Sequence, residues 1–162
     1  MWIINPDLLT AKLRHQEDLS EIDANLQAVK RIERWLRQSI RVYQTIGVET
    51  VLSTAKYRKL VRAAKRAGFE VRLIYVIVDS VDTQLARIKL RVAKGGHDVA
   101  PEKVAARRAR STEQLRWFFW AVDEAWVYDN SGSEPDLIAR RGEAIGWIKA
   151  HALPEIRTAL LT

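Results

Sequence analysis

Cysteine is absent from the chain, and so is any long apolar run. Without cysteine, the protein forms neither disulfides nor thiolate metal sites. No stretch of about 18 apolar residues occurs, so a membrane-spanning helix is not expected. The first residues, MWIINPDLL, contain no basic segment and reach an aspartate early, unlike a secretory signal peptide. These absences predict a cytoplasmic protein without a membrane partner.

Glycine is sparse, and its placement excludes one common nucleotide-binding motif. The glycines are Gly47, Gly68, Gly95, Gly96, Gly132, Gly142 and Gly146. A Walker A phosphate loop has the pattern GxxxxGK[ST], and none of these glycines completes it. The chain therefore lacks the backbone nest, the lysine and the Mg²⁺-binding hydroxyl with which P-loop proteins hold a nucleotide.

Positive charge, in contrast, is plentiful. The 162 residues include 27 Lys and Arg against 20 Asp and Glu, a formal net charge of +7. This excess fits anionic partners such as nucleotides, nucleic acid or an acidic protein, and it fits arginine-rich helical surfaces equally well. No repeat or Pro/Gly/Ser-rich linker divides the sequence. A single domain over residues 1–162 is therefore predicted.

Apolar periodicity predicts strands that alternate with helices. Strands are expected at residues 2–4, 47–53, 69–78 and 125–128. Helices are expected after Pro6, between Ser20 and Gly47, after a Thr54 cap, over 80–92 and over 101–122. Near the end, residues 137–140 and 144–148 can form a hairpin, with a last helix from Pro154. In the long second helix, the expected core face is Ile22, Leu26, Val29, Leu36, Ile40 and Tyr43.

This alternation predicts an α/β fold, a parallel sheet flanked by helices on both faces. Ligands of such sheets bind at the carboxyl ends of the strands. Asp7 follows the first strand and can act as a general base or position Mg²⁺, or simply complement a helix dipole. Glu49 shares a strand face with Val51 and Ser53. It can hold a substrate hydroxyl, or pair with an arginine.

Residues 87–116 form the most basic part of the sequence. Two predicted helices rich in Arg and Lys flank the segment Gly95-Gly96-His97-Asp98. A hinged lid that delivers guanidinium groups to phosphates has this composition, and so does a solvated helical hairpin. His97 fits a hydrogen-bonding loop residue, and no histidine pair has metal-ligand spacing. No metal site is therefore predicted.

Tryptophan is frequent, with six residues in the chain. Aromatic side chains interleaved with arginine can stack on nucleic-acid bases. However, Trp117, Phe118, Phe119 and Trp120 are consecutive in a predicted helix, where core packing is the commoner role. Nucleic-acid binding is accordingly the less favoured interpretation.

Six segments occur together in an order that resembles the zeta-toxin-like kinases of the P-loop superfamily. They are NPDLL, GVETVLST, RLIYVIV, RVAKGGHDV, RRARS and VYDNSG, and the resemblance extends from Asn5 to about Arg140. It implies a P-loop kinase fold, ATP and Mg²⁺ as cofactors, and transfer of the ATP γ-phosphate to a small hydroxyl substrate such as UDP-N-acetylglucosamine. An antitoxin protein is an implied partner.

The resemblance also implies roles for individual residues. Asp7 matches the catalytic base. Glu49 and Thr50, with Ser53, match the strand end that contacts substrate. Arg91 and Arg107 look like the lid arginines that reach the transferred phosphate. Arg108, Asn130 and Ser131 match positions close to the nucleotide.

The missing Walker A loop sets this chain apart from those kinases, in which the loop and a central strand precede the NPD segment. A different start, a deletion or function without the loop would each account for it. We expect negligible kinase activity from these 162 residues. The alternative is a non-catalytic module that binds a nucleotide sugar or an antitoxin. Loss of a central strand would also leave strand edges open to homo-oligomer formation.

Overall fold

The computed structural model describes residues 2–95, 98–142 and 146–161, and for Trp2 and Asp7 it describes the backbone alone. The chain is mixed α/β, as the sequence predicts, and 56% of it is helical. It divides into two compact units. Unit 1 comprises residues 1–51 and 62–69, and unit 2 comprises residues 52–61 and 70–162. Each unit is described separately below, and the predicted single domain stays a prediction.

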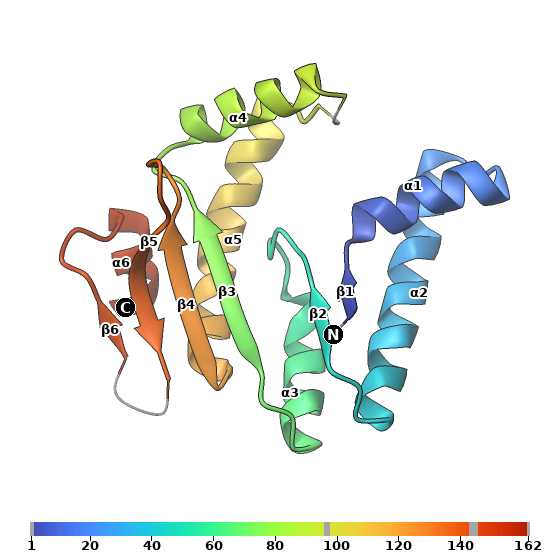
Figure 1. Ribbon diagram of the computed structural model, residues 1–162, viewed down its shortest axis with the longest axis horizontal. Coiled ribbons are helices and arrows are strands. Elements are labelled where there is room, and N and C mark those ends of the chain that lie inside the picture. Colours follow the sequence, from blue (N-terminus) through green and yellow to red (C-terminus); the bar gives the residue numbers. More distant parts are fainter. Residues whose placement is uncertain (1, 96–97, 143–145, 162) are drawn as a thin grey trace. The chain divides into compact units, whose positions relative to one another are not determined.

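Unit 1 contains two parallel strands and two helices (Figure 1). Strand β1 (Trp2–Ile4) pairs with β2 (Ile46–Val48). Helix α1 (Pro6–Glu17) follows β1, and α2 (Glu21–Arg41) follows α1. The Ser20 hydroxyl caps α2 by accepting a hydrogen bond of 3.1 Å from the Asp23 amide, which confirms the predicted start. The C-terminal part of α3 (Arg58–Arg66) completes the unit.

The core of unit 1 differs from the predicted one. Helix α2 buries Ala24, Ala28, Ile32, Leu36 and Ser39. The first two of these join Leu13 of α1 in one apolar cluster. The predicted face was wrong for four residues that are exposed: Ile22 (81%), Leu26 (52%), Val29 (38%) and Tyr43 (74%). The buried alanines provide the reason, because small residues let two helices approach closely at 8–10 Å.

Strand β2 is shorter than its sequence predicts. Residues 47–53 read as one strand, yet β2 ends at Val48. Its partner β1 is only three residues long and is soon followed by α1. The Glu49 amide still donates to the Ile4 carbonyl at 2.9 Å, and beyond this bond β1 offers no further partner. Leu52 then adopts a left-handed φ of 57°, which a strand cannot contain. Thr54 precedes the short 3-10 turn at Ala55–Tyr57 but makes no capping bond.

Unit 2 is built on a four-stranded sheet in the order β3-β4-β5-β6. Strands β3 (Arg72–Ile77) and β4 (Glu124–Asp129) are parallel. Strands β5 (Asp136–Arg141) and β6 (Trp147–Ile148) continue the sheet in antiparallel pairs. The predicted C-terminal hairpin is therefore present, and the sheet is mixed rather than purely parallel.

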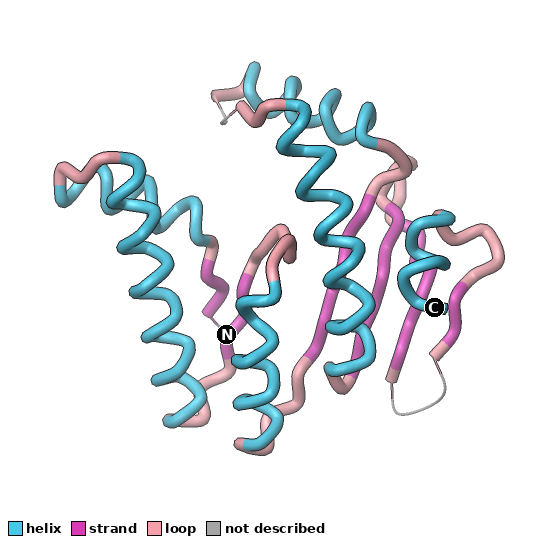
Figure 2. The backbone as a smooth tube through the Cα atoms, turned by 180° about the vertical axis from the view of Figure 1, so that it is seen from behind, coloured by secondary structure: helices cyan, strands magenta, loops and turns pink. Residues whose placement is uncertain are grey.

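Three helices accompany this sheet: α4 (Val81–Ala93), α5 (Pro101–Ala121) and α6 (Pro154–Leu161). Figure 2 shows α5 and α6 over one face of the sheet. Their buried side chains, among them Leu115, Phe119 and Ile156, form the core with Val127 and Ile138. The predicted core role is confirmed for Phe118 and Phe119, which are buried, and is wrong for Trp120, which is 51% exposed.

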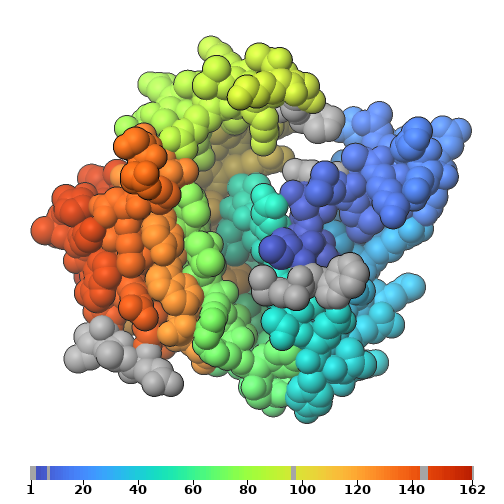
Figure 3. Space-filling model, in the orientation of Figure 1, coloured from blue at the N-terminus to red at the C-terminus, as the bar shows by residue number. Residues whose placement is uncertain are grey.

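The opposite face of the sheet has no covering helix within unit 2. Ile74 and Val76 of β3 are 69% and 57% exposed there. Side chains of β3, in green, and of β4 and β5, in orange, form the surface of unit 2 in Figure 3. Within the described residues, β3 pairs with β4 alone. Unit 2 thus presents an uncovered apolar face next to an unpaired strand edge.

Among the helices that the structure describes, none combines the length and apolar character needed to cross a membrane.

Candidate functional site

In unit 1, the carboxyl ends of both parallel strands meet at one polar edge. Asn5 follows β1, and Glu49 follows β2. The Asn5 side-chain amide donates a hydrogen bond of 2.9 Å to the Glu49 carboxylate. The same Asn5 side chain accepts a bond of 3.3 Å from the Leu8 amide, so it also caps α1. The Glu49 carboxylate is thereby oriented while the residue stays exposed to solvent.

The remaining predicted residues of this edge lie close in the chain. The backbone of Asp7 lies in the first turn of α1, and its side chain lies outside the described part. Thr50 is exposed beside Glu49. Ser53 belongs to unit 2, where it is half-buried. The structure therefore brings Asn5 and Glu49 into contact and places Thr50 directly after them.

In unit 2, the carboxyl ends of β3 and β4 are joined by hydrogen bonds. The Ser131 hydroxyl accepts a bond of 2.6 Å from the Asp79 amide and donates to the Asp129 carboxylate. The Ser131 amide donates to the same carboxylate at 2.9 Å. The Asn130 amide donates to the Ile77 carbonyl at 2.7 Å. Ser131 and Asn130, both predicted to lie near a nucleotide, thus fasten β4 to β3.

Asp79 stands at the start of α4. The hydroxyl of Thr83 donates a hydrogen bond to its carboxylate, and this is the main reason that the Asp79 pKa lies below its usual value. Bonds from Ser80 and the positive charge of Arg108 act in the same direction, against partial desolvation. The ionised carboxylate complements the positive end of the helix dipole. Because Asp79 already occupies this helix N-terminus, an anion has little reason to bind there.

Arg108 is the most deeply buried arginine of the described site, with a side chain only 7% exposed. Its guanidinium donates to the Val78 carbonyl at 2.6 Å and to the Asp79 carbonyl at 3.3 Å. It also forms an ion pair with Glu155 of α6. One nitrogen, Nη1, is buried without a hydrogen-bond partner among the described residues. These contacts tie α5 and α6 to the end of β3.

Helix α4 carries the first part of the predicted lid. Its exposed face borders a groove of about 550 Å³ lined by Arg87, Leu90, Arg91, Lys94 and Gly95. Arg87 donates a hydrogen bond of 2.6 Å to the Asn130 carbonyl, which links the groove to the end of β4. Arg91 lies one turn further on and is exposed. The groove therefore gathers several cations, and the Arg87 bond connects them to the end of β4.

Helix α5 carries the second part of that lid. Arg107 is exposed, whereas its neighbour Arg108 is buried. Of this pair, only Arg107 is accessible to a ligand in solution. Gly96 and His97, predicted to form the turn between the two helices, lie outside the described residues.

The residues present do not form a complete ATP·Mg²⁺ site. The sequence has no Walker A loop, and the carboxylates of Asp79 and Asp129 are already engaged by neighbouring hydroxyls. Across the described residues, no three Asp, Glu or His side chains gather as a metal-binding group. The described residues therefore offer cations for phosphates, while the sequence contains no Walker A loop to hold a nucleoside triphosphate.

Sequence reasoning missed three residues of these edges. Asn5 precedes a proline at a helix start, a pattern that indicates a cap but not a contact with a residue 44 positions away. Arg87 belongs to the predicted lid, but no separate role was predicted for it. No sequence pattern predicted a role for Glu155, because its partner Arg108 was expected at the surface.

Comparison with known proteins finds one informative relative. No established protein-family model matches the chain, and no solved structure matches it. An uncharacterized protein from Haemophilus influenzae (strain ATCC 51907 / DSM 11121 / KW20 / Rd) is 32% identical over 106 residues, which cover 65% of this chain and 73% of the relative. The chain therefore belongs to the same family as this uncharacterized Haemophilus protein.

Proposed function

We propose that this chain is the substrate-holding and lid-bearing portion of a zeta-toxin-like kinase. The supporting observation is the groove on α4, where Arg87 bonds to the Asn130 carbonyl at the strand ends and Arg91 lies exposed one turn away. Cations held at the carboxyl ends of parallel strands suit a phosphorylated ligand. The order of the NPDLL, RVAKGGHDV and VYDNSG segments, which resembles that of the zeta-toxin-like kinases, also supports the proposal.

In this proposal, each polar edge has its own task. The Glu49 carboxylate, oriented by Asn5, accepts a hydrogen bond from a hydroxyl of the substrate, and Thr50 adds a second polar contact. Asp7 removes the proton from the hydroxyl that is phosphorylated. The cations of the α4 groove, Arg91 among them, bind the diphosphate of the nucleotide sugar. During transfer, Arg91 and Arg107 would also stabilise negative charge on the transferred phosphate, since a guanidinium binds phosphate oxygens in a bidentate manner. The substrate is a nucleotide sugar such as UDP-N-acetylglucosamine.

ATP and Mg²⁺ belong to the proposed reaction, yet these 162 residues lack the loop that would hold them. The γ-phosphate of ATP would supply the transferred group. The residues of this chain would orient the acceptor hydroxyl and provide the cations of the lid. We therefore expect nucleotide-sugar binding without phosphoryl transfer when the chain is assayed alone.

The second candidate function is a non-catalytic module that binds a nucleotide sugar or an antitoxin. The observation that favours it is Arg108, predicted at the nucleotide but buried against Val78, Asp79 and Glu155. A strand end whose polar groups are hydrogen-bonded to one another can support a binding site without taking part in a reaction. A kinase and a binding module differ in their behaviour when the missing loop is supplied, because only the kinase then turns over ATP.

A homo-oligomer is also part of the proposal. Strand β3 reads RLIYVI and has a single charge at its start, and its outer edge is unpaired within the described residues. Exposed apolar edges of this kind recruit a further strand. Light scattering is expected to show a species larger than one chain, and Val76→Lys is expected to return it to a monomer.

The test of the proposed function is calorimetric titration with UDP-N-acetylglucosamine. Arg91→Gln removes a cation from the α4 groove, and Lys89→Gln is the matched control, because Lys89 is exposed on the same helix but does not line the groove. We expect the first variant to weaken binding about tenfold, the loss of one charge-assisted contact, and the control to bind like the parent. Equal affinity of both variants would contradict the proposed site.

A further inference from the structure

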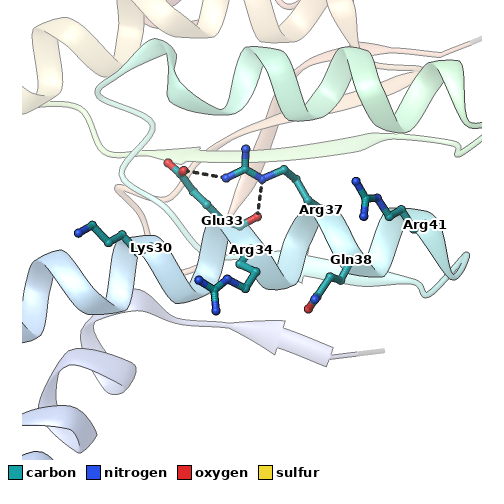
Figure 4. Close-up of a pocket in the computed structure, with 6 residues that line it drawn as sticks. All are labelled: Lys30, Glu33, Arg34, Arg37, Gln38 and Arg41. Atoms are coloured by element: carbon teal, nitrogen blue, oxygen red, sulfur yellow. Dashed lines mark hydrogen bonds and ion pairs between the residues drawn. The ribbon is translucent and has the colours of Figure 1, made fainter.

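A second basic surface lies on α2 of unit 1, away from the residues assigned above. A groove of about 380 Å³ runs along this helix and is lined by Lys30, Glu33, Arg34, Arg37, Gln38 and Arg41 (Figure 4). All six residues are exposed. The four cations recur at intervals of four, three and four residues, so they form one stripe along the helix.

The stripe has little negative charge to balance it. Glu33 is its single acid, and Arg37 binds it with a distance of 3.5 Å between guanidinium and carboxylate. In the part of the chain that the structure describes, Lys30, Arg34 and Arg41 have no ion pair. Their neighbour Arg31 points elsewhere and forms a bidentate pair with Glu17. Three cations therefore remain available to an external anion.

Helix stability does not explain the whole stripe. Cations near a helix C-terminus interact favourably with the macrodipole, but this effect fades beyond the last turn. It accounts for Arg41, the basic residue of the last turn of α2. Lys30 and Arg34 lie two to three turns earlier and gain nothing from it. The macrodipole therefore leaves the alignment of Lys30 and Arg34 with Arg41 unexplained.

We propose that this stripe binds the phosphate backbone of a nucleic-acid strand. The stripe extends over 11 residue steps, about 16 Å at the α-helical rise. This length is enough to contact several successive phosphates of one strand. Arginine and glutamine side chains are common donors to phosphate oxygens. The stripe reads no sequence, because none of its contacts reaches a base.

A protein partner fits the groove less well. Protein interfaces have an apolar core and are depleted of lysine and glutamate, whereas none of the six lining residues is apolar. The exposed apolar residues of α2, namely Ile22, Leu26 and Val29, lie in its N-terminal half and outside the lining. A nucleic-acid backbone needs no apolar core, since the release of counterions supplies its affinity.

This surface is distinct from the aromatic run at residues 117–120, for which nucleic-acid binding was the less favoured interpretation. Phe118 and Phe119 are buried, whereas Trp120 is 51% exposed, so that run presents isolated rings and not the successive exposed rings of a stacking platform. The inference from α2 is carried by charge and geometry alone. It is also independent of the proposed kinase function, because it uses none of the same residues.

The test is fluorescence anisotropy of labelled oligonucleotides of about 20 nucleotides, titrated with the full chain between about 50 and 200 mM salt. Single-stranded RNA, single-stranded DNA and duplex DNA serve as separate probes. Lys30→Gln/Arg34→Gln/Arg41→Gln removes the three available cations. The matched control, Lys12→Gln/Arg14→Gln/Arg31→Gln, removes the same charge from exposed positions off the stripe. Glutamine has a helix propensity similar to that of lysine and arginine, and circular dichroism checks the fold of both variants.

We expect the parent to bind at least one probe with a steep salt dependence. The stripe variant should bind at least about tenfold more weakly, and its logarithmic salt slope should fall by about 2 for single strands. The control should retain most of the parent affinity. Conversion of Arg34, Arg37 and Arg41 to lysine should preserve binding, since the charge remains. Absence of binding at low salt, or equal losses in the stripe and control variants, would overturn the proposal.

Discussion

In each unit, a pair of parallel strands ends at a polar edge. The two edges differ in how many of their hydrogen-bonding groups already have partners within the protein. In unit 1, the exposed Glu49 carboxylate has one described hydrogen bond, from Asn5. In unit 2, Asp79, Asp129, Ser131 and Arg108 bond to one another or to backbone groups. An edge with spare acceptors can take a ligand at little cost, whereas an internally bonded edge mainly holds the fold together.

Among the substitutions that test this contrast, the one at Arg108 is expected to change the free energy of unfolding most. Arg108→Met keeps an unbranched apolar stem but leaves the Val78 carbonyl and Glu155 without their partner. Removing one member of a buried ion pair costs about 3–5 kcal/mol, and the 34% exposure of the Glu155 side chain places the cost at the lower end. Urea unfolding followed by tryptophan fluorescence measures it. Arg107→Met, at an exposed position, should change the free energy of unfolding by less than about 0.5 kcal/mol.

Ser131 is expected to have the next largest effect. Ser131→Ala removes the hydroxyl that joins the Asp79 amide to the Asp129 carboxylate. The loss should be about 1.5 kcal/mol, because the exposed Asp79 amide and the part-buried Asp129 carboxylate lose their shared partner. Ser133→Ala, at an exposed position two residues away, should be close to neutral. Similar thermal unfolding midpoints for the two variants would show that the unit 2 edge is not held in this way.

Glu49 tests the opposite edge. Glu49→Gln should leave the free energy of unfolding almost unchanged, because the residue is exposed and an amide oxygen can still accept the Asn5 bond. Affinity for UDP-N-acetylglucosamine should nevertheless fall about tenfold, equivalent to about 1.4 kcal/mol. Parallel calorimetry and urea unfolding separate the two effects. A variant that loses stability but keeps its affinity would reverse the roles assigned to this residue.

The smallest expected effect concerns pH. Hydrogen bonds from Lys149 and His151 hold the pKa of Asp136 below its usual value. A lowered pKa in the folded state means that the contribution to stability is complete above the pKa of the unfolded chain, about 4. The contribution disappears as the pH falls through the folded value. Asp136→Asn should therefore lower the unfolding midpoint at pH 7 by a small amount, and the difference from the parent should shrink below about pH 4. A difference that grows on acidification would contradict the assignment.

Much of the fold could be predicted from local signals. Ser20 with Asp23, Gly68 and Pro101 each mark a helix end by a backbone requirement that depends on a few neighbouring residues. Gly68 indeed adopts a φ of 81° directly after α3. The positions of polar residues at strand ends were predictable for the same reason, since parallel strands bring their carboxyl ends together.

Packing was harder to predict, because it depends on partners distant in the sequence. Helix α2 has two apolar stripes, one with Ile22 and Leu26 and one with Ala24 and Ala28. Hydrophobicity alone favours the former, and the close approach of α1 selects the latter. Arg107 and Arg108 differ by a single step of helix rotation. Nothing local in the sequence shows that the second is buried, since arginine is seldom an interior residue.

The measurement that tests the account most directly is a nuclear magnetic resonance titration of the isotopically labelled chain with UDP-N-acetylglucosamine and, separately, with Mg·ATP. The account predicts saturable shifts of the amide signals at Asn5, Glu49 and Thr50 and along the α4 groove with the nucleotide sugar, and no saturable shifts with Mg·ATP. Saturable shifts with Mg·ATP, or none at these residues with the nucleotide sugar, would contradict the proposed division between a substrate-holding chain and a missing phosphate loop.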